Sequence, residues 1–395
     1  MSRGDDRGHG PPPEERIRRR EARVIDGRDV TPAVGTRGEP GRWERASPGA
    51  RVRGFKARFE DARWSFLYSD SASRYEADGA DGQVPAAARL MRGGREVPVP
   101  VRAPVIRPNV WTWEVPVYFF FGGTAAGASF VALACEVADD ARSARVARLV
   151  AMGAAGCGGP LLIADLGRPE RFLHMFRIFK TRSPMSMGAW CLLAFTQTGG
   201  GAVLADLLGR ARIARALTAA TAAFGVYLGS YTGVLLAGTA VPAWNRSRAF
   251  VAPIFVCTAT ASGAAATRLA LAATGAPRRS APTRAALAAL ETAAMSGELV
   301  LSALNDRRLG IAGRALESGR PGRYLKTARG LTAAGLAGRA LRALAPRRGP
   351  AGADHVPSAL FLAAAMLYRL GWVSAGRPSA LDHDAVAALA RSGRR

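Results

Sequence analysis

Histidine is scarce in this chain, and its placement excludes one kind of redox protein. The 395 residues contain only four histidines, His9, His174, His355 and His383, and all of them lie in tails, loops or the edges of apolar segments. A membrane cytochrome of the b type binds haem through paired axial ligands within its helices. We therefore expect no haem in this chain, so any electrons must come from a partner.

Cysteine is equally sparse and has no metal-binding spacing. Cys135, Cys157, Cys191 and Cys257 lie inside or at the ends of apolar segments, and no two of them form a C-x-x-C pair. This pattern excludes a disulfide framework, a zinc site and iron–sulfur ligation. We interpret the four residues as small buried thiols at helix contacts and predict no metal site.

The first 110 residues lack sustained apolar periodicity. Residues 1–20 have no apolar core of the kind found in a signal peptide, so we expect no cleaved leader. Residues 51–78 carry enough aromatic side chains to dock a short element on a partner or on the membrane domain, but too few for an independent core. We predict a largely irregular hydrophilic extension over 1–110, ending in a proline-rich extended linker.

From residue 111 onward, long uncharged segments alternate with short loops that contain arginine. Apolar segments of about 18 residues or more are long enough to cross a bilayer. The sequence therefore predicts an all-α, polytopic transmembrane helix bundle over 111–382, followed by a tail at 383–395. We expect about eight spans, at 115–135, 149–166, 185–205, within 216–245, 249–267, 285–304, 330–344 and 356–375.

The formal net charge of +25 would suggest a nucleic-acid partner in a soluble protein. Here much of the arginine lies in loops beside apolar segments, where it contacts lipid headgroups. No basic motif interleaved with aromatic residues is present, so we expect membrane lipid and no nucleic acid as a partner.

Two pairs of polar residues near the ends of predicted spans could contact a flat aromatic ligand. Tyr227 and Tyr231 are four residues apart and share one helix face beside several glycines. Tyr118 follows Glu114 by four residues at the start of the first span. A phenol can donate a hydrogen bond to a quinone carbonyl while its ring lines an apolar slot, although tyrosine near a span end is usually an interface anchor.

A second candidate site lies after the second span. Asp165 ends that span and Arg168 follows three residues later, so the two can form a structural salt bridge or contribute to a proton-coupled quinone pocket. Residues 172–180 are amphipathic and indicate an interfacial helix. Because the start of the first span and the ends of the second and fourth spans reach the same membrane face, Tyr118, Asp165 and Tyr231 could converge.

Glu291 and Glu298 are seven residues apart on one face of the sixth predicted span. Carboxylates within a membrane are costly and are candidates for a proton path. They also leave open a transporter or ion-translocating subunit, for which an inverted repeat would be expected. We find no convincing repeat.

At these motifs the sequence resembles the NrfD family, the membrane subunits of polysulfide reductases, nitrite reductases and related complexes. The matching segments, in order, are WEVPVYFFFGGTAAG, ADLGRPERF, SPMSMGAW, YTGVLLAGTAVPAW and LGWVSAGRPSALD. The resemblance covers residues 111–382 and leaves out the first 110.

The resemblance implies an eight-helix fold without bound haem or metal, in the bacterial inner membrane. It implies exchange of electrons between menaquinol or quinone and a four-cluster ferredoxin-like iron–sulfur subunit, itself coupled to a molybdopterin or multihaem catalytic subunit. Carried onto this sequence, the residues around the quinone are Tyr118, Asp165, Arg168 and Tyr231. Some members have histidine where Tyr118 stands, so Tyr118 is better suited to donate a hydrogen bond than to exchange protons.

We therefore predict the quinone-reactive subunit of a respiratory oxidoreductase complex rather than an enzyme acting alone. Asp165 and Arg168 would carry the proton-coupled chemistry, and the glutamates of the sixth span a proton path. The alternatives are a structural membrane anchor without a quinone site and an ion-translocating or transport subunit.

Overall fold

The computed structural model describes a part of the chain in two units, Met1–Pro104 and Val105–Arg395. The expected docking segment at 51–78 lies outside the described residues. The residues described are 87–92, 95–100, 106, 108–109, 111–166, 169–181, 183–274, 281–344 and 353–392.

The first unit contains a β-hairpin that was not predicted from the sequence. Strand β1 (Ala87–Arg92) pairs antiparallel with β2 (Arg95–Pro100), and Arg92 stands opposite Arg95. Proline has no N–H to donate, but both strands of a two-stranded sheet are edge strands, which tolerate it. The backbone around Pro98 is extended, as expected, but it is paired in a hairpin and does not form a free linker.

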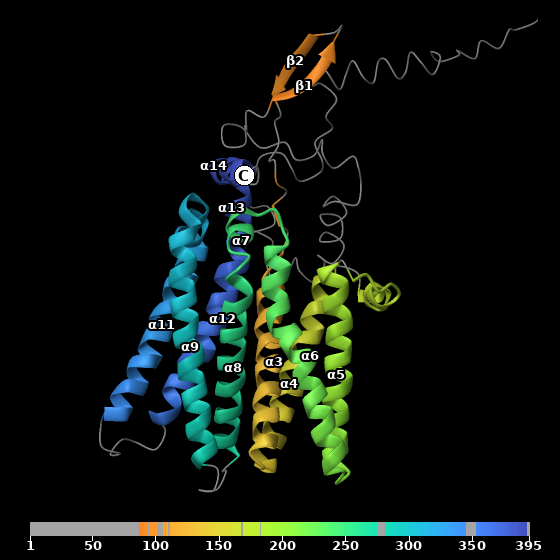
Figure 1. The fold of residues 1–395 in the computed structure, drawn as a ribbon, viewed down its shortest axis with the longest axis vertical. Coiled ribbons are helices and arrows are strands. Elements are labelled where there is room, and N and C mark those ends of the chain that lie inside the picture. The colour runs from red at the N-terminus through yellow and green to blue at the C-terminus, as the bar shows by residue number, and fades with distance from the viewer. Residues whose placement is uncertain are drawn as a thin grey trace, which may run out of the picture. The chain divides into compact units, whose positions relative to one another are not determined.

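The second unit is a bundle of long helices that run side by side in alternating directions (Figure 1). In the described part of the protein, eight helices are 19 residues or longer. They are α3 (Glu114–Val137), α4 (Ala141–Asp165), α5 (Pro184–Leu207), α6 (Ala211–Ala237), α8 (Val251–Ala273), α9 (Ala281–Leu309), α11 (Gly319–Leu344) and α12 (Val356–Ser374).

Shorter elements connect the long helices. The 3-10 helix η3 (Pro169–Phe176) precedes α5, and η6 (Ala353–His355) precedes α12. One end of the bundle carries α7 (Pro242–Arg246), η5 (Gly310–Gly313), α10 (Arg314–Glu317), α13 (Gly376–Leu381) and α14 (His383–Ser392). We call this the α7 end. There α3 begins and α4, α6 and α9 finish (Figure 1).

Within the part of the chain that the structure describes, six segments are long and apolar enough to cross a membrane, and they contain α3, α4, α6, α8, α9 and α12. The remaining long helices, α5 and α11, have the length of a span but are not among these six segments. This arrangement confirms the predicted all-α transmembrane bundle. The helix that contains the seventh predicted span is longer than that span, because α11 begins at Gly319 and passes through the charged residues Arg320, Arg323 and Lys326. Charged side chains lower hydropathy but do not end a helix.

Local signals at the helix ends set the tight connections. Asp139 has φ 55°, and the side chain of Asp140 then accepts a hydrogen bond from the Ser143 N–H at 3.1 Å, which starts α4. Ser183 caps α5 in the same way, with Pro184 in the first turn. Gly209 turns the backbone between α5 and α6 with φ 69°. Such caps satisfy backbone N–H groups that have no partner within the helix.

Small residues hold α3 and α8 in close contact. A Cβ atom on Gly127 would lie 1.9 Å from the Ala259 carbonyl oxygen, and one on Gly263 would lie 2.1 Å from the Ala128 nitrogen. This is the close backbone approach expected of small residues in membrane helices.

The aromatic core of the bundle lies toward the α7 end. The ring of Trp111 stacks on that of Trp244, with centroids 5.4 Å apart. The Trp244 indole N–H donates to the Trp372 carbonyl oxygen at 2.8 Å. The expectation that all four cysteines are buried is confirmed for Cys135 and Cys191, but Cys257 is half-buried and Cys157 is exposed on α4.

Candidate functional site

The two predicted tyrosines of α3 and α6 lie close together inside the bundle. Tyr118 is 8% exposed and Tyr231 is 6% exposed. Tyr118 lies on α3 and Tyr231 on α6, two helices that pack against each other. The rings of Tyr227 and Tyr231 stack, with centroids 5.9 Å apart and an interplanar angle of 24°. Tyr227 is only half-buried, so this aromatic pair reaches from the interior toward the surface of the bundle.

Glycines on two neighbouring helices make room for these rings. A Cβ atom on Gly188 of α5 would lie 2.3 Å from Tyr231 Cζ and 2.7 Å from its hydroxyl oxygen. A Cβ atom on Gly158 of α4 would lie 3.5 Å from Tyr118 Cδ2. The tyrosine cluster, which we define as Tyr118, Tyr227 and Tyr231, is therefore framed by α3, α4, α5 and α6.

The sequence reading did not assign Gly188 a role, although it lies within the SPMSMGAW segment. Its neighbour Cys191, one helical turn on, is buried beside the tyrosine cluster, and its thiol donates to the Phe224 carbonyl oxygen at 3.4 Å. The only sequence feature that could have singled out Gly188 is its place two residues before Trp190, near the start of a predicted span. Its meaning depends on α5 packing against α6, which the sequence alone does not fix.

The acidic residues assigned to the quinone site have different surroundings. Glu114 is 4% exposed at the start of α3, and the Thr112 hydroxyl donates to its Oε2. Asp165 is exposed at the last residue of α4, at the same α7 end of the bundle. Arg168 lies outside the described residues, so its pairing with Asp165 stays a prediction.

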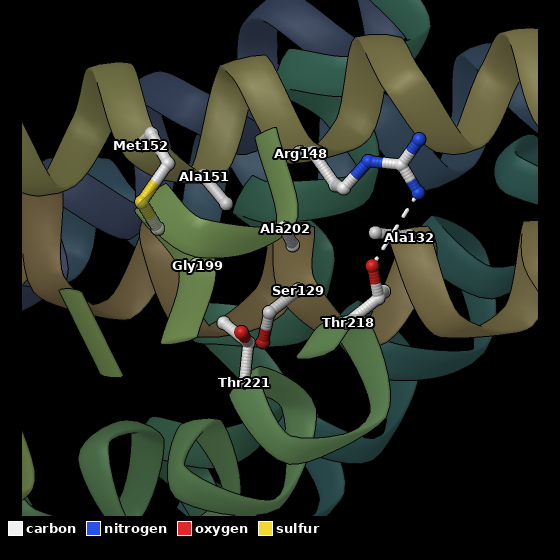
Figure 2. A pocket seen from close by; sticks show the side chains of 9 residues that line it. All are labelled: Ser129, Ala132, Arg148, Ala151, Met152, Gly199, Ala202, Thr218 and Thr221. Atoms are coloured by element: carbon white, nitrogen blue, oxygen red, sulfur yellow. Dashed lines mark hydrogen bonds between the residues drawn. The ribbon is translucent and has the colours of Figure 1, made fainter. Parts of the chain in front are cut away.

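A small cavity lies between α3, α4, α5 and α6 (Figure 2). Its volume of about 10 Å³ is just enough for one water molecule and far too small for a quinone ring. The Arg148 guanidinium lies at its edge and donates from Nη1 to the Thr218 hydroxyl at 3.3 Å. The residues lining the cavity are Ser129, Ala132, Arg148, Ala151, Met152, Gly199, Ala202, Thr218 and Thr221.

Arg148 belongs to a buried charge cluster that the sequence reading overlooked. It is 5% exposed, pairs with Glu136 on α3, and its Nη2 lies 3.2 Å from an Asp206 carboxylate oxygen on α5. In the sequence, these charged residues lie near the ends of apolar segments. They could not be distinguished there from ordinary loop residues. Because all are paired, the cluster ties three helices together away from the α7 end.

Glu291 is fully buried in an ion pair. The Arg339 guanidinium of α11 donates to Glu291 Oε2, and the Ser358 hydroxyl of α12 donates to the same oxygen at 2.7 Å. Arg268 of α8 in turn donates to the Ser358 hydroxyl at 2.8 Å. Arg339, a charged residue within the seventh predicted span, is therefore the partner of a buried carboxylate.

His355 borders this ion pair just before α12. Burial lowers the pKa of His355, and the positive charge of Arg268 lowers it further. The imidazole of His355 therefore stays neutral to a lower pH than it would in an unfolded polypeptide.

Glu298 has no such cation. It is 1% exposed, and the Ser302 hydroxyl donates to its Oε1 at 2.8 Å. Ser302 also shares a hydrogen bond with the Tyr368 hydroxyl of α12. Among the residues that the structure describes, no Lys or Arg nitrogen forms an ion pair with Glu298. The two glutamates of one helix face are thus held in different ways.

Arg369 is a further buried charge, and its role was not recognised from the sequence. It is 2% exposed, and its guanidinium carbon lies 3.7 Å from the Phe255 ring centroid. Its Nη2 donates to the Phe255 carbonyl oxygen at 3.0 Å. This cation–π contact joins α12 to α8 inside the membrane-spanning bundle.

These features define a multi-pass helical membrane protein with a buried aromatic cluster near one end and buried charges at several levels. Within the described residues, no three His, Cys, Asp or Glu side chains gather in a way that could hold a metal ion.

The family model described as "Polysulphide reductase, NrfD" matches residues 105–330. The chain belongs to this family, as its motifs had indicated. It is 29% identical over 150 residues to the C subunit of polysulfide reductase from Wolinella succinogenes, a match covering 32% of this protein and 47% of that subunit. The matched region thus spans about half the length of the curated relative.

Proposed function

We propose that this protein is the quinone-reactive membrane subunit of a respiratory oxidoreductase complex in the bacterial cytoplasmic membrane. The observation that carries the proposal is the tyrosine cluster, which brings two phenols of α3 and α6 together against glycines of α4 and α5. The family membership of the protein supports the same function.

In this proposal, the headgroup of menaquinone or a related quinone lies beside the tyrosine cluster. The Tyr231 and Tyr118 hydroxyls donate hydrogen bonds to the ring carbonyls, and the Tyr227 ring lines the apolar side. A quinol supplies two electrons and two protons. Asp165 with Arg168 exchanges protons with water at the α7 end, and Glu114 lies one helical turn from Tyr118 on the same helix.

The electrons would pass to or from an iron–sulfur subunit of the four-cluster ferredoxin type, bound to a molybdopterin or multihaem catalytic subunit. The Wolinella relative is a subunit of polysulfide reductase, and subunits in such complexes divide the work between membrane and catalytic parts. We therefore assign quinone binding to this protein and the terminal chemistry to a partner.

The second candidate function is a structural anchor that holds the iron–sulfur partner and binds no quinone. The buried ion pairs around Glu291 and Arg148 would serve such an anchor equally well. The tyrosine cluster favours the first function, because stacked phenols against glycines are not needed for anchoring alone.

Binding of a fluorescent quinol analogue to the purified complex separates these functions. We expect saturable quenching for the wild type and weaker binding for Tyr231→Phe, Asp165→Asn and Gly188→Ala. Gly200→Ala is the matched control for Gly188→Ala, because Gly200 lies on α5 with no other atom within 4 Å of the added Cβ. An assembled wild-type complex that shows no saturable binding would leave the anchor as the function.

A further inference from the structure

One face of α9 carries buried polar side chains at regular intervals. Glu291, Glu298 and Asn305 follow one another at spacings of seven residues and are 0%, 1% and 1% exposed. At a rise of 1.5 Å per residue, successive members of this series are about 10 Å apart along the helix. They therefore occupy three levels of the membrane-spanning bundle.

The carboxylate at the level farthest from the α7 end is held in an ion pair. Glu291 is held by Arg339 and Ser358, as described above. Protonating its carboxylate would leave the Arg339 guanidinium buried without its anion, which is costly in a protein interior.

An apolar layer separates Glu291 from Glu298. Met295 lies between them on the same face, is 1% exposed, and packs with Ala261 of α8 and with Phe361 and Ala364 of α12. The side chains of this layer have no polar group that could pass a proton, so the two glutamates do not form a continuous path in this conformation.

The opposite side of Glu298 is polar. Ser302 and the Tyr368 hydroxyl continue from its carboxylate toward the α7 end. Asn305 comes next on the same face of α9, and neither its amide oxygen nor its amide nitrogen has a hydrogen-bond partner among the described residues. Buried amides without protein partners are normally satisfied by internal water. The following residue, Asp306, is partly exposed and pairs with Arg329 at 2.6 Å.

We propose that Glu298 is a proton-accepting carboxyl at the inner end of a water-holding polar pocket between α9 and α12, which opens toward the α7 end past Asn305. Its hydrogen-bond partners are hydroxyl groups, so Glu298 can gain or lose a proton without breaking an ion pair. The other titratable groups that face it are Cys257 of α8, Tyr368 of α12 and, further away, the Asp306–Arg329 pair. The proton comes from pocket water, which is replenished from the α7 end.

This inference goes beyond the proposed function, which has no proton site on α9, and it does not require quinone to bind. Of the two α9 glutamates, Glu298 is assigned proton uptake and Glu291 a structural role. The proton site is therefore separate from the tyrosine cluster of α3 and α6.

Labelling with dicyclohexylcarbodiimide tests the identity of the site, because this apolar reagent adds to protonated carboxyls within membranes. In the intact wild-type complex, we expect mass spectrometry to find the adduct on Glu298 and not on Glu291. The adduct should persist in Glu291→Gln and vanish in Glu298→Gln. Labelling of Glu291, or of neither residue in the wild type, would overturn the proposal.

Infrared spectroscopy of the carboxyl tests the route. The carbonyl band of the protonated Glu298 carboxyl can be identified by its absence in Glu298→Gln. Transfer from water to heavy water should shift this band. We expect Asn305→Leu, which removes the polar amide at similar volume, to slow that shift several-fold. An unchanged rate in a folded Asn305→Leu complex would show that protons reach Glu298 by another route.

Quinol-analogue binding by Glu298→Gln keeps this inference distinct from the proposed function. We expect binding at the wild-type level, because the tyrosine cluster does not include α9. Specific labelling of Glu298 in a wild-type complex without quinol-analogue binding would refute the quinone function and support this proton site.

Discussion

Replacing Gly127 by alanine should separate the two helices at the centre of the bundle. The added Cβ would lie 1.9 Å from the Ala259 carbonyl oxygen and 2.6 Å from the carbonyl carbon. Non-bonded heavy atoms are comfortable at about 3.5 Å, so α3 and α8 would have to move apart by roughly 1.5 Å. The same movement would loosen the contact at Gly263, where α8 lies against the Ala128 backbone.

The size of the effect follows from two opposing contributions. Inserting an extra methyl group into a packed core costs about 1–3 kcal/mol, and the upper end applies here because backbone, not a flexible side group, has to move. Alanine in a helix interior is about 1 kcal/mol more favourable than glycine. We therefore expect Gly127→Ala to lose about 2 kcal/mol of unfolding free energy.

Gly122 provides the control on the same helix, because it is buried but has no atom within 4 Å of an added Cβ. Gly122→Ala should be neutral or more stable than the wild type. Thermal unfolding can be followed by the reaction of a fluorogenic thiol reagent with the buried Cys135 and Cys191. If Gly127→Ala melts at or above the temperature of Gly122→Ala, the close helix contact described here is not present.

Three further perturbations test other parts of the structure. Gly188→Ala places a Cβ 2.3 Å from Tyr231 Cζ and should weaken quinol-analogue binding at least as much as Tyr231→Phe, measured by fluorescence titration. Arg339→Met leaves Glu291 buried without its cation and should cost about 3–5 kcal/mol, most of it recovered when Glu291→Gln is added, as a double-mutant cycle of thermal unfolding would show. Burial lowers the pKa of His355, so below about pH 6.5 the unfolded protein binds a proton that the folded protein does not, and stability falls. His355→Gln should reduce the loss of melting temperature between pH 7.5 and pH 5.5, and an equal loss in both proteins would contradict this assignment.

Much of the bundle could be predicted because a membrane span is a local property of the sequence. The uncharged segments that became α3 and α8 are long enough by themselves to indicate helices across a bilayer. The start of α11 could not be found in this way, because Arg320 and Arg323 extend the helix beyond its apolar part. The pairing of β1 with β2 was also missed, since proline at Pro98 argued against a strand.

The candidate site was only partly accessible from the sequence. The spacing of Tyr227 and Tyr231 indicated a shared helix face, and alternation of spans placed Tyr118 at the same end. Gly188 could not be assigned, because its effect depends on which helices are neighbours. For the same reason the pairing of Arg339 with Glu291 could not be predicted. The quinone-binding role of the tyrosines stays a prediction.

The most direct test of the quinone function is photoaffinity labelling of the intact complex with an azido-substituted quinone, followed by peptide mapping. We predict labelling within residues 114–124, 185–195 and 224–234, the parts of α3, α5 and α6 that surround the tyrosine cluster, and its loss when excess unlabelled quinone competes. Labelling that no competitor reduces, or that is confined to α9 and α11, would contradict a quinone site at the tyrosine cluster.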